Sequence, residues 1–131
     1  MADTRRPLSP HLQVYRWQVQ MVSSILHRAT GIALAVGSLL VVGGLLALAA
    51  GEDCFNHFKA VIGHPVGMLL LVGWSWALFY HLCNGIRHLV QDTGAGYAIN
   101  QFVRSSWLSV AISLVLTVLV WVYVFTAGGA A

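Results

Sequence analysis

The sequence predicts an all-α integral membrane protein with three transmembrane helices. Only 8% of its 131 residues are charged, whereas a soluble domain carries about 25%. The mean hydropathy is +0.76, and Asp, Glu, Lys and Arg are absent from residues 31–51, 60–86 and 105–131. Each run provides the roughly 20 residues that a helix needs to cross the hydrocarbon. Since the backbone in lipid must satisfy its own hydrogen bonds, these runs should be helices.

We expect one membrane-anchor domain over residues 1–131, with a cytoplasmic arm at 1–18 and helices at about 19–50, 66–91 and 104–127. The arm contains two prolines and no apolar period, which favours an extended segment on the surface over a helix; a poorly ordered terminus is the alternative. The first helix is longer than the membrane is thick, so its first two turns should be interfacial.

The segment between the first two apolar helices should be a loop that ends at Gly63-His64-Pro65, where the turn residues mark a break. It holds Cys54 and His57 in a C-x-x-H arrangement. A single pair lacks the four ligands of a structural zinc site, so we expect no metal there.

The basic residues predict the topology. Six of the seven Lys and Arg residues lie before or at the start of the first helix, or in the second loop, and only Lys59 lies in the first loop. Because Lys and Arg favour the cytoplasmic side, the N-terminus should be cytoplasmic and the C-terminus periplasmic. No signal peptide or transit extension is expected, which favours the bacterial inner membrane. The net charge of +3 follows from this asymmetry, and we expect no nucleic-acid binding.

His81 is the most informative residue of the second apolar run, because an ionisable side chain inside the bilayer is costly and typical of a functional site. His88 lies on the same helix face, separated by about 10.5 Å of rise. Two imidazoles on opposite sides of one haem iron need nitrogens only about 4 Å apart. The two histidines therefore cannot bind one iron together, and a haem would need a second ligand from elsewhere.

The face of this helix that carries His81 suits a haem. It is formed by residues three or four positions apart: Trp74, Ala77, His81, Gly85 and His88. The small residues on either side of His81 leave room for a flat macrocycle. The alternative is a close helix–helix contact in which His81 hydrogen-bonds across the bundle.

The first helix carries a second polar group, formed by Ser24, His27 and Arg28, whose spacing brings their side chains near one another. Arg87 and His88 should lie at the same membrane depth. Together they would suit a ligand that bears a carboxylate or a carbonyl. The alternative is that the arginines reach the lipid phosphates independently.

The third apolar run contains no His, Asp, Glu, Lys or Arg. Its small polar residues recur every four positions, at Ser105, Ser109, Ser113 and Thr117. Such a stripe allows helices to approach closely, and we assign it a structural role.

Two motifs extend these observations. They are Arg6-Pro7 and Leu12 followed by Ser24-x-x-His27-Arg28-x-Thr30-Gly31, and His81-x-x-x-Gly85-Ile86-Arg87-His88-Leu89 followed by Asp92 and Gly94. With the three-helix layout they resemble the cytochrome b membrane-anchor family of succinate dehydrogenase, respiratory complex II. The chain departs from the family at Gln91, where an aromatic residue or methionine is usual.

The resemblance implies a helix bundle with a second anchor subunit and one haem b shared between the two. His81 would be the axial ligand, and the partner would supply the other. His27, Arg28 and His88 would lie near the haem propionates, and Ser24 and Arg28 would line the ubiquinone site. FAD and iron–sulfur clusters would belong to the flavoprotein and iron–sulfur subunits, so this chain alone has no catalytic residue and no activity of its own.

Three other functions fit the sequence less well. A haem-free structural anchor of a quinone-linked respiratory complex would keep the arm and helices without a haem. An anchor that holds two haems needs further membrane histidines on separate helices, and residues 105–131 have none. A transporter subunit predicts polar or broken helices at mid-membrane, whereas these helices are apolar in their outer halves.

Overall fold

The computed structural model describes residue 14 and residues 16–128. These residues form four helices and no strand: α1 (Val19–Ala50), α2 (Glu52–Gly63), α3 (Pro65–Asp92) and α4 (Ile99–Ala127). Three of them, α1, α3 and α4, are long and apolar enough to cross a membrane. The all-α class and the three membrane helices are thereby confirmed. The expected arm lies mostly outside the described residues.

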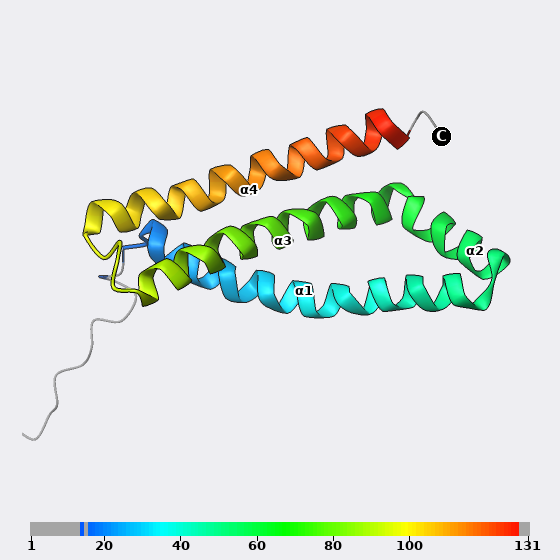
Figure 1. Ribbon diagram of the computed structural model, residues 1–131, viewed down its shortest axis with the longest axis horizontal. Helices are drawn as coiled ribbons and strands as arrows, with labels where there is room; N and C mark the ends of the chain where they lie inside the picture. Colours follow the sequence, from blue (N-terminus) through cyan, green and yellow to red (C-terminus); the bar gives the residue numbers. More distant parts are fainter. Residues whose placement is uncertain (1–13, 15, 129–131) are drawn as a thin grey trace, which may run out of the picture.

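The three long helices run lengthwise beside one another, and α2 turns the chain back between α1 and α3 (Figure 1). The bounds of α1 are those expected, and α3 differs by one residue at each end. Helix α4 begins at Ile99, five residues before the expected start at 104. The apolar run marks only the part of a helix that lies in hydrocarbon, and the residues before it, which include Asn100, Gln101 and Arg104, continue the same helix.

The expectation of a loop around Cys54 is wrong, because this segment forms α2. The chain turns at Gly51, whose φ of 126° is open mainly to glycine. Glu52 and Asp53 occupy the first turn of α2, where negative charge stabilises a helix N-terminus. Phe55, Phe58 and Ile62 of α2 face the space beside α1, and Phe58 packs so closely on Gly44 that a Cβ there would lie 2.9 Å from its ring.

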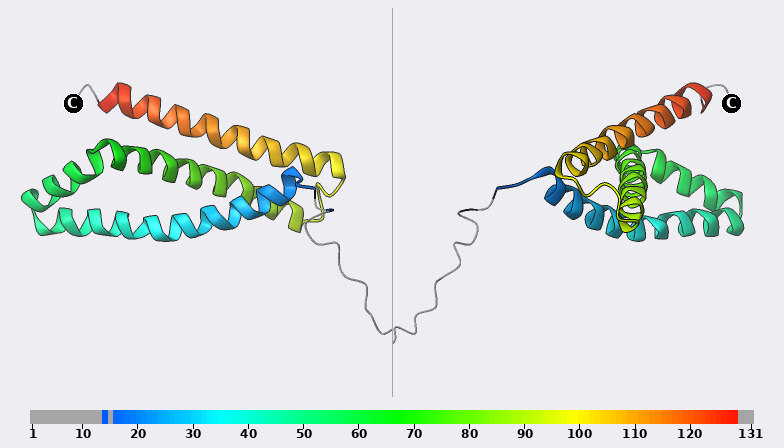
Figure 2. Two further views of the ribbon diagram at one scale, coloured as in Figure 1. Left: turned by 180° about the vertical axis from the view of Figure 1, so that it is seen from behind. Right: turned by 60° about the vertical axis from the view of Figure 1, so that its left-hand side comes forward.

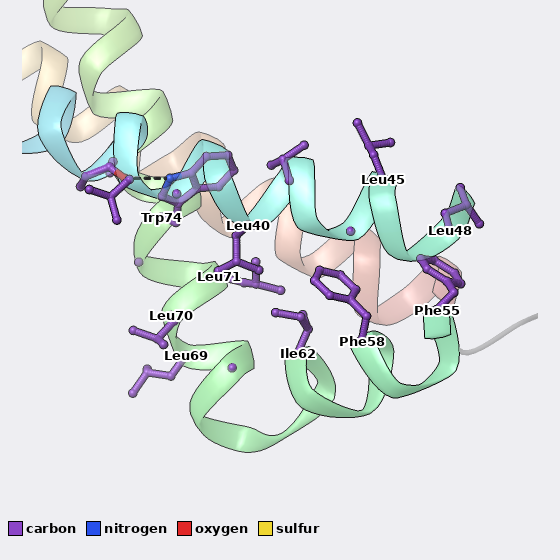
Figure 3. Close-up of a pocket in the computed structure, with 18 residues that line it drawn as sticks. Leu40, Leu45, Leu48, Phe55, Phe58, Ile62, Leu69, Leu70, Leu71 and Trp74 are labelled. Atoms are coloured by element: carbon purple, nitrogen blue, oxygen red, sulfur yellow. Dashed lines mark hydrogen bonds between the residues drawn. The ribbon is translucent and has the colours of Figure 1, made fainter. Parts of the chain in front are cut away.

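Helix α2 holds the neighbouring ends of α1 and α3 apart, as both views of the bundle show (Figure 2). The space between them is an apolar cavity of about 760 Å³. Phe58 and Ile62 of α2 line one side of it, and Trp74 of α3 closes its inner end (Figure 3). The Trp74 indole donates to the carbonyl of Ala33, 3.2 Å away. Close contact between α1 and α3 therefore begins at Trp74 and continues toward the other end of the bundle.

The interior of the bundle is more polar than its surface. Of the described residues, the only apolar ones that are fully buried are Ala77 and Tyr80, whereas nine polar or charged residues are buried. On α4 the buried residues are small: Ser106, Ser109, Ser113 and Thr117. Their hydroxyls donate to carbonyls three or four residues earlier in the same helix. Because these side chains are short and satisfied within α4, α3 and α4 can pack closely along this stripe.

Candidate functional site

The tautomer of His81 is set by a hydrogen bond between helices. Its Nδ1 lies 3.1 Å from the carbonyl oxygen of His27 on α1. A carbonyl can only accept, so Nδ1 must carry the proton and donate it. In the neutral ring, the other nitrogen, Nε2, is then unprotonated. A neutral imidazole held in this way is the form of histidine that binds a metal ion.

Thr30 reinforces this arrangement. Its hydroxyl lies 2.8 Å from the carbonyl of Leu26 and 3.0 Å from that of His27, so its single proton is donated within α1. The same oxygen lies 3.3 Å from His81 Nδ1. Because Thr30 has no proton left for His81, it can only accept from it. Both neighbours of Nδ1 therefore favour the same tautomer.

Gly31 provides the space for the His81 ring. A Cβ at this position would lie 3.0 Å from Cε1 of His81, closer than ordinary van der Waals contact. The imidazole thus packs directly against the backbone of α1. This contact gives a structural reason for the glycine that follows the Ser24-x-x-His27-Arg28-x-Thr30 motif.

The three histidines near this end of the bundle form one group. The rings of His27 and His81 are stacked, with centroids 4.0 Å apart and planes inclined by 11°. The ring of His88 lies 5.1 Å from that of His27. His27 Nδ1 is buried and has no hydrogen-bond partner among the described residues. A buried polar atom of this kind needs a hydrogen-bond partner from beyond the described residues.

Ser24 and Arg28 lie together on a neighbouring face of α1. The Arg28 Nε lies 3.4 Å from the Ser24 carbonyl, and the Arg28 side chain is exposed. Ser23 and His27, which contact α3, are each one residue earlier, so Ser24 and Arg28 are turned about 100° from that contact. The Arg28 side chain is open to a ligand or to another chain, and the half-buried Ser24 lies beside it.

Arg87 does not join this group, and the expected cluster with two guanidinium groups is wrong in this respect. The Arg87 side chain is buried and turned toward α4. Its Nε donates to Ser105 Oγ at 3.2 Å, and its guanidinium lies 4.4 Å from the centroid of the Phe102 ring. The position of Arg87 in the sequence indicates its depth in the membrane. The direction in which its side chain points depends on where α4 packs.

A buried polar network that the sequence patterns did not predict connects α1, α3 and α4. Tyr80 donates from its hydroxyl to the Ser23 carbonyl at 3.1 Å. Ser23 Oγ donates to Asn84 Oδ1 at 3.0 Å, and Arg87 Nη1 donates to the same oxygen at 2.9 Å. The spacing of Tyr80, Asn84, Arg87 and Gln91 places them on one helix face. A polar stripe of this kind in an apolar helix is visible in the sequence, and it is the pattern from which the network could have been predicted.

The network also orients His88. Because a guanidinium can only donate, Asn84 must present Oδ1 to Arg87. Its amide nitrogen then faces His88 Nε2, 3.3 Å away. An amide nitrogen donates as well, so His88 Nε2 accepts and the ring proton resides on Nδ1. The buried arginine thus fixes, through Asn84, which nitrogen of His88 can donate to a ligand.

Known proteins resemble the chain over most of its length. The family model of the succinate dehydrogenase/fumarate reductase transmembrane subunit matches residues 2–120. The chain is 42% identical to the succinate dehydrogenase cytochrome b556 subunit of Paracoccus denitrificans, over 95% of this chain and 98% of that protein. It is 40% identical to the subunit of the same name from Rickettsia felis, over 90% of this chain and 92% of that one. The mitochondrial succinate dehydrogenase cytochrome b560 subunit of Sus scrofa is 42% identical, over 88% of this chain and 68% of its own.

Proposed function

The chain belongs to the succinate dehydrogenase/fumarate reductase transmembrane subunit family, and on this premise we propose that it is the haem b- and ubiquinone-binding membrane anchor of succinate:quinone oxidoreductase. Its relatives are named as cytochrome b subunits of succinate dehydrogenase. Like them, it works as a subunit and not as an enzyme on its own. It passes electrons from an iron–sulfur subunit to ubiquinone.

The observation that carries the haem assignment is the hydrogen bond from His81 Nδ1 to the His27 carbonyl. It leaves Nε2 of His81 as an unprotonated nitrogen inside the membrane, which suits the axial position of a haem iron. When bound, the haem iron supplies a one-electron redox centre. His88 is too far along α3 to be the second ligand. We therefore assign that ligand to a second membrane-anchor subunit.

The charged edge of the haem fits the remaining histidines. The buried Nδ1 of His27 has no partner among the described residues, and a propionate oxygen is an acceptor for it. His88 carries its proton on Nδ1 and can donate in the same way. Arg28 adds a charged donor one position after His27. These three residues are the ones we assign to the propionates.

Ser24 and Arg28 are the residues we assign to ubiquinone. The Ser24 hydroxyl donates to one quinone carbonyl, and the exposed Arg28 guanidinium stabilises the negative charge that develops on the ring oxygen as electrons arrive. In the part of the chain that the structure describes, no carboxylate pairs with these two residues. Protons for the quinol must come from partner residues or water. A donor fixed where charge develops, as Arg28 would be, acts mainly on the rate of reduction.

The remaining cofactors and partners follow from the same assignment. FAD and the iron–sulfur clusters belong to a flavoprotein subunit and an iron–sulfur subunit, which dock at the end of the bundle that carries Ser24 and Arg28. We place the chain in the bacterial inner membrane, with a cytoplasmic N-terminus and a periplasmic C-terminus, because six of the seven Lys and Arg residues lie on that side. The bilayer surrounds the apolar outer faces of the helices.

The axial assignment is tested by the optical spectrum of the purified complex. His81→Tyr should remove the low-spin haem b spectrum, while His57→Tyr, on the exposed face of α2, should leave it unchanged. An unperturbed low-spin spectrum in His81→Tyr would overturn the assignment. A wild-type complex without Soret absorption would support the alternative, a haem-free structural anchor.

A further inference from the structure

A second cavity, of about 520 Å³, lies between α3 and α4 near the end of the bundle at which α3 ends and α4 begins. We refer to it as the α3–α4 cavity. Arg87, Gln91 and Ser105 form its polar end, and apolar side chains that include Leu108 and Ile112 form its walls. None of the residues assigned above to haem or quinone lines it. It is a separate site.

The polar end of the cavity holds a charge that no described residue of opposite charge pairs with. Arg87 is only 7% exposed, and the two groups that accept its hydrogen bonds, Asn84 Oδ1 and Ser105 Oγ, are uncharged. A guanidinium is always protonated. A buried charge in an apolar bundle is costly unless it is paired. The side chain therefore fits an anion that comes from outside the chain.

Gln91 gives an independent sign of a ligand at the same place. It lies one turn after Arg87 on the same face of α3 and is 6% exposed. Its Nε2 is buried and has no hydrogen-bond partner among the described residues. Buried amide groups are nearly always satisfied. Because Gln91 lines the cavity, an acceptor that enters there can pair this donor after a small shift of the side chain.

The start of α4 adds a third positive contribution. The helix begins at Ile99 without a side-chain cap and without an acidic residue in its first turn. Its first N–H groups and the positive end of its dipole are therefore open to an anion. Gly96 and Gln101, on either side of this helix start, line the cavity.

The walls indicate what else the ligand contains. Leu108, Ile112 and Leu116 follow one another along α4, away from the polar end. From Ser105 to Leu116 the helix rises by about 16 Å, which is roughly half of the hydrocarbon thickness. The polar end of the cavity suits an anionic group, and the apolar furrow suits a hydrocarbon chain that is one leaflet long. A ligand with both parts is an anionic amphiphile.

We propose that the α3–α4 cavity binds an anionic phospholipid. The lipid phosphate accepts hydrogen bonds from Arg87 and Gln91 beside the start of α4, and one acyl chain lies along Leu108 and Ile112. Basic pockets between transmembrane helices are suited to such headgroups. A carboxylate from a partner helix would neutralise Arg87 but would not need the long furrow. The phospholipid accounts for both ends of the cavity, and the inference does not depend on the haem or quinone assignments.

The proposal is tested on the whole complex, purified with its partner subunits. The complex is stripped with detergent and then exchanged into micelles that contain dioleoylphosphatidylglycerol or dioleoylphosphatidylcholine, and the lipid retained per complex is measured by mass spectrometry. We expect at least a tenfold preference for phosphatidylglycerol. Inorganic phosphate should not displace it, because the acyl chain contributes to binding.

Two variants address the two ends of the cavity. Gln91→Glu keeps the size of the side chain but places a negative charge beside the phosphate, and Ile112→Trp fills the furrow at a position that is 41% exposed. Each should lower retained phosphatidylglycerol at least fivefold. Arg104→Gln is the matched control, because it removes an exposed charge next to Ser105 without touching the cavity.

Assembly of each variant is checked by co-purification of the partner subunits. If one variant fails to assemble, the result for the other variant is sufficient to test the proposal. Unchanged retention in an assembled Gln91→Glu or Ile112→Trp complex overturns the proposal. Displacement by inorganic phosphate, with Ile112→Trp still binding, would show a simple anion site instead. An intact wild-type complex that retains no phosphatidylglycerol would show that a partner side chain fills the cavity.

Discussion

His27 contacts His81 in two ways at once. Its ring stacks on the His81 ring at 4.0 Å between centroids, and its carbonyl accepts the proton of His81 Nδ1 at 3.1 Å. One residue of α1 thus sets both the tilt and the tautomer of an imidazole on α3. The carbonyl contact depends on backbone alone, so it survives any substitution of His27 that keeps α1 in place. The stacking contact does not.

Gly31→Ala should therefore disturb the His81 site without removing a ligand. The new Cβ would lie 3.0 Å from His81 Cε1, so the ring must shift by a few tenths of an ångström. We expect full assembly but a changed low-spin haem spectrum and a shifted haem midpoint potential. The matched control is Gly73→Ala, since a Cβ at Gly73 meets nothing within 4 Å. Identical spectra and potentials for the two variants would contradict this account.

Gly37→Ala should destabilise the contact between α1 and α3. A Cβ at Gly37 would overlap Trp74 Nε1, so the indole must leave its place and lose its hydrogen bond to the Ala33 carbonyl. Overpacking of this kind costs about 1–3 kcal/mol. We expect a lower thermal midpoint of the purified complex. Gly43→Ala, where the space around the Cβ is open, should keep or raise the midpoint; equal midpoints for both variants would argue against the contact.

Asn84→Leu should be far more damaging than Asn84→Asp. The leucine leaves the buried donors of Ser23 and Arg87 without their shared acceptor, and a buried donor without an acceptor costs about 1–3 kcal/mol, more when it is charged. The aspartate keeps an acceptor oxygen and adds a charge opposite to that of Arg87. We expect loss of assembled complex in membranes for the first variant and its retention for the second. Equal yields would exclude a structural role for the network.

The sequence was sufficient for the three membrane helices, because each is marked by a run without charges that is long enough to span the bilayer. It was not sufficient for α2. This helix is 12 residues long and has charged residues in its first turn, so neither length nor apolarity sets it apart. Its helical form depends on packing, chiefly on the contact of Phe58 with α1, which a search for spanning segments does not detect.

The depth of the candidate-site residues in the membrane was predictable from the sequence, but the direction in which each side chain points was not. His81 was identified because placing an imidazole inside the membrane costs free energy, which is typical of residues with a function. Arg87 and His88 are adjacent in sequence and equally deep, yet one turns to α4 and the other to His27. Which side a residue faces depends on the order in which three helices pack, and a single helix does not encode that order. Ser23 was missed for the same reason.

Arg28→Ala should separate quinone reduction from the earlier steps of electron transfer. The Arg28 guanidinium is exposed and next to Ser24, on a face of α1 that no other described helix covers closely. Loss of a fixed donor at a site of developing charge typically lowers the rate about 10²–10³-fold. In an assembled complex we expect quinone-dependent turnover to fall by about this factor, while succinate oxidation by a soluble dye persists.

Arg28→Lys should recover part of the rate, because it keeps the charge but not the planar fork. Arg104→Ala, which removes an exposed arginine at the same end of the bundle, is the control and should behave as wild type. Unchanged quinone turnover in Arg28→Ala would remove this residue from the mechanism, since a stabilising charge that can be deleted without effect does not contact the reacting oxygen.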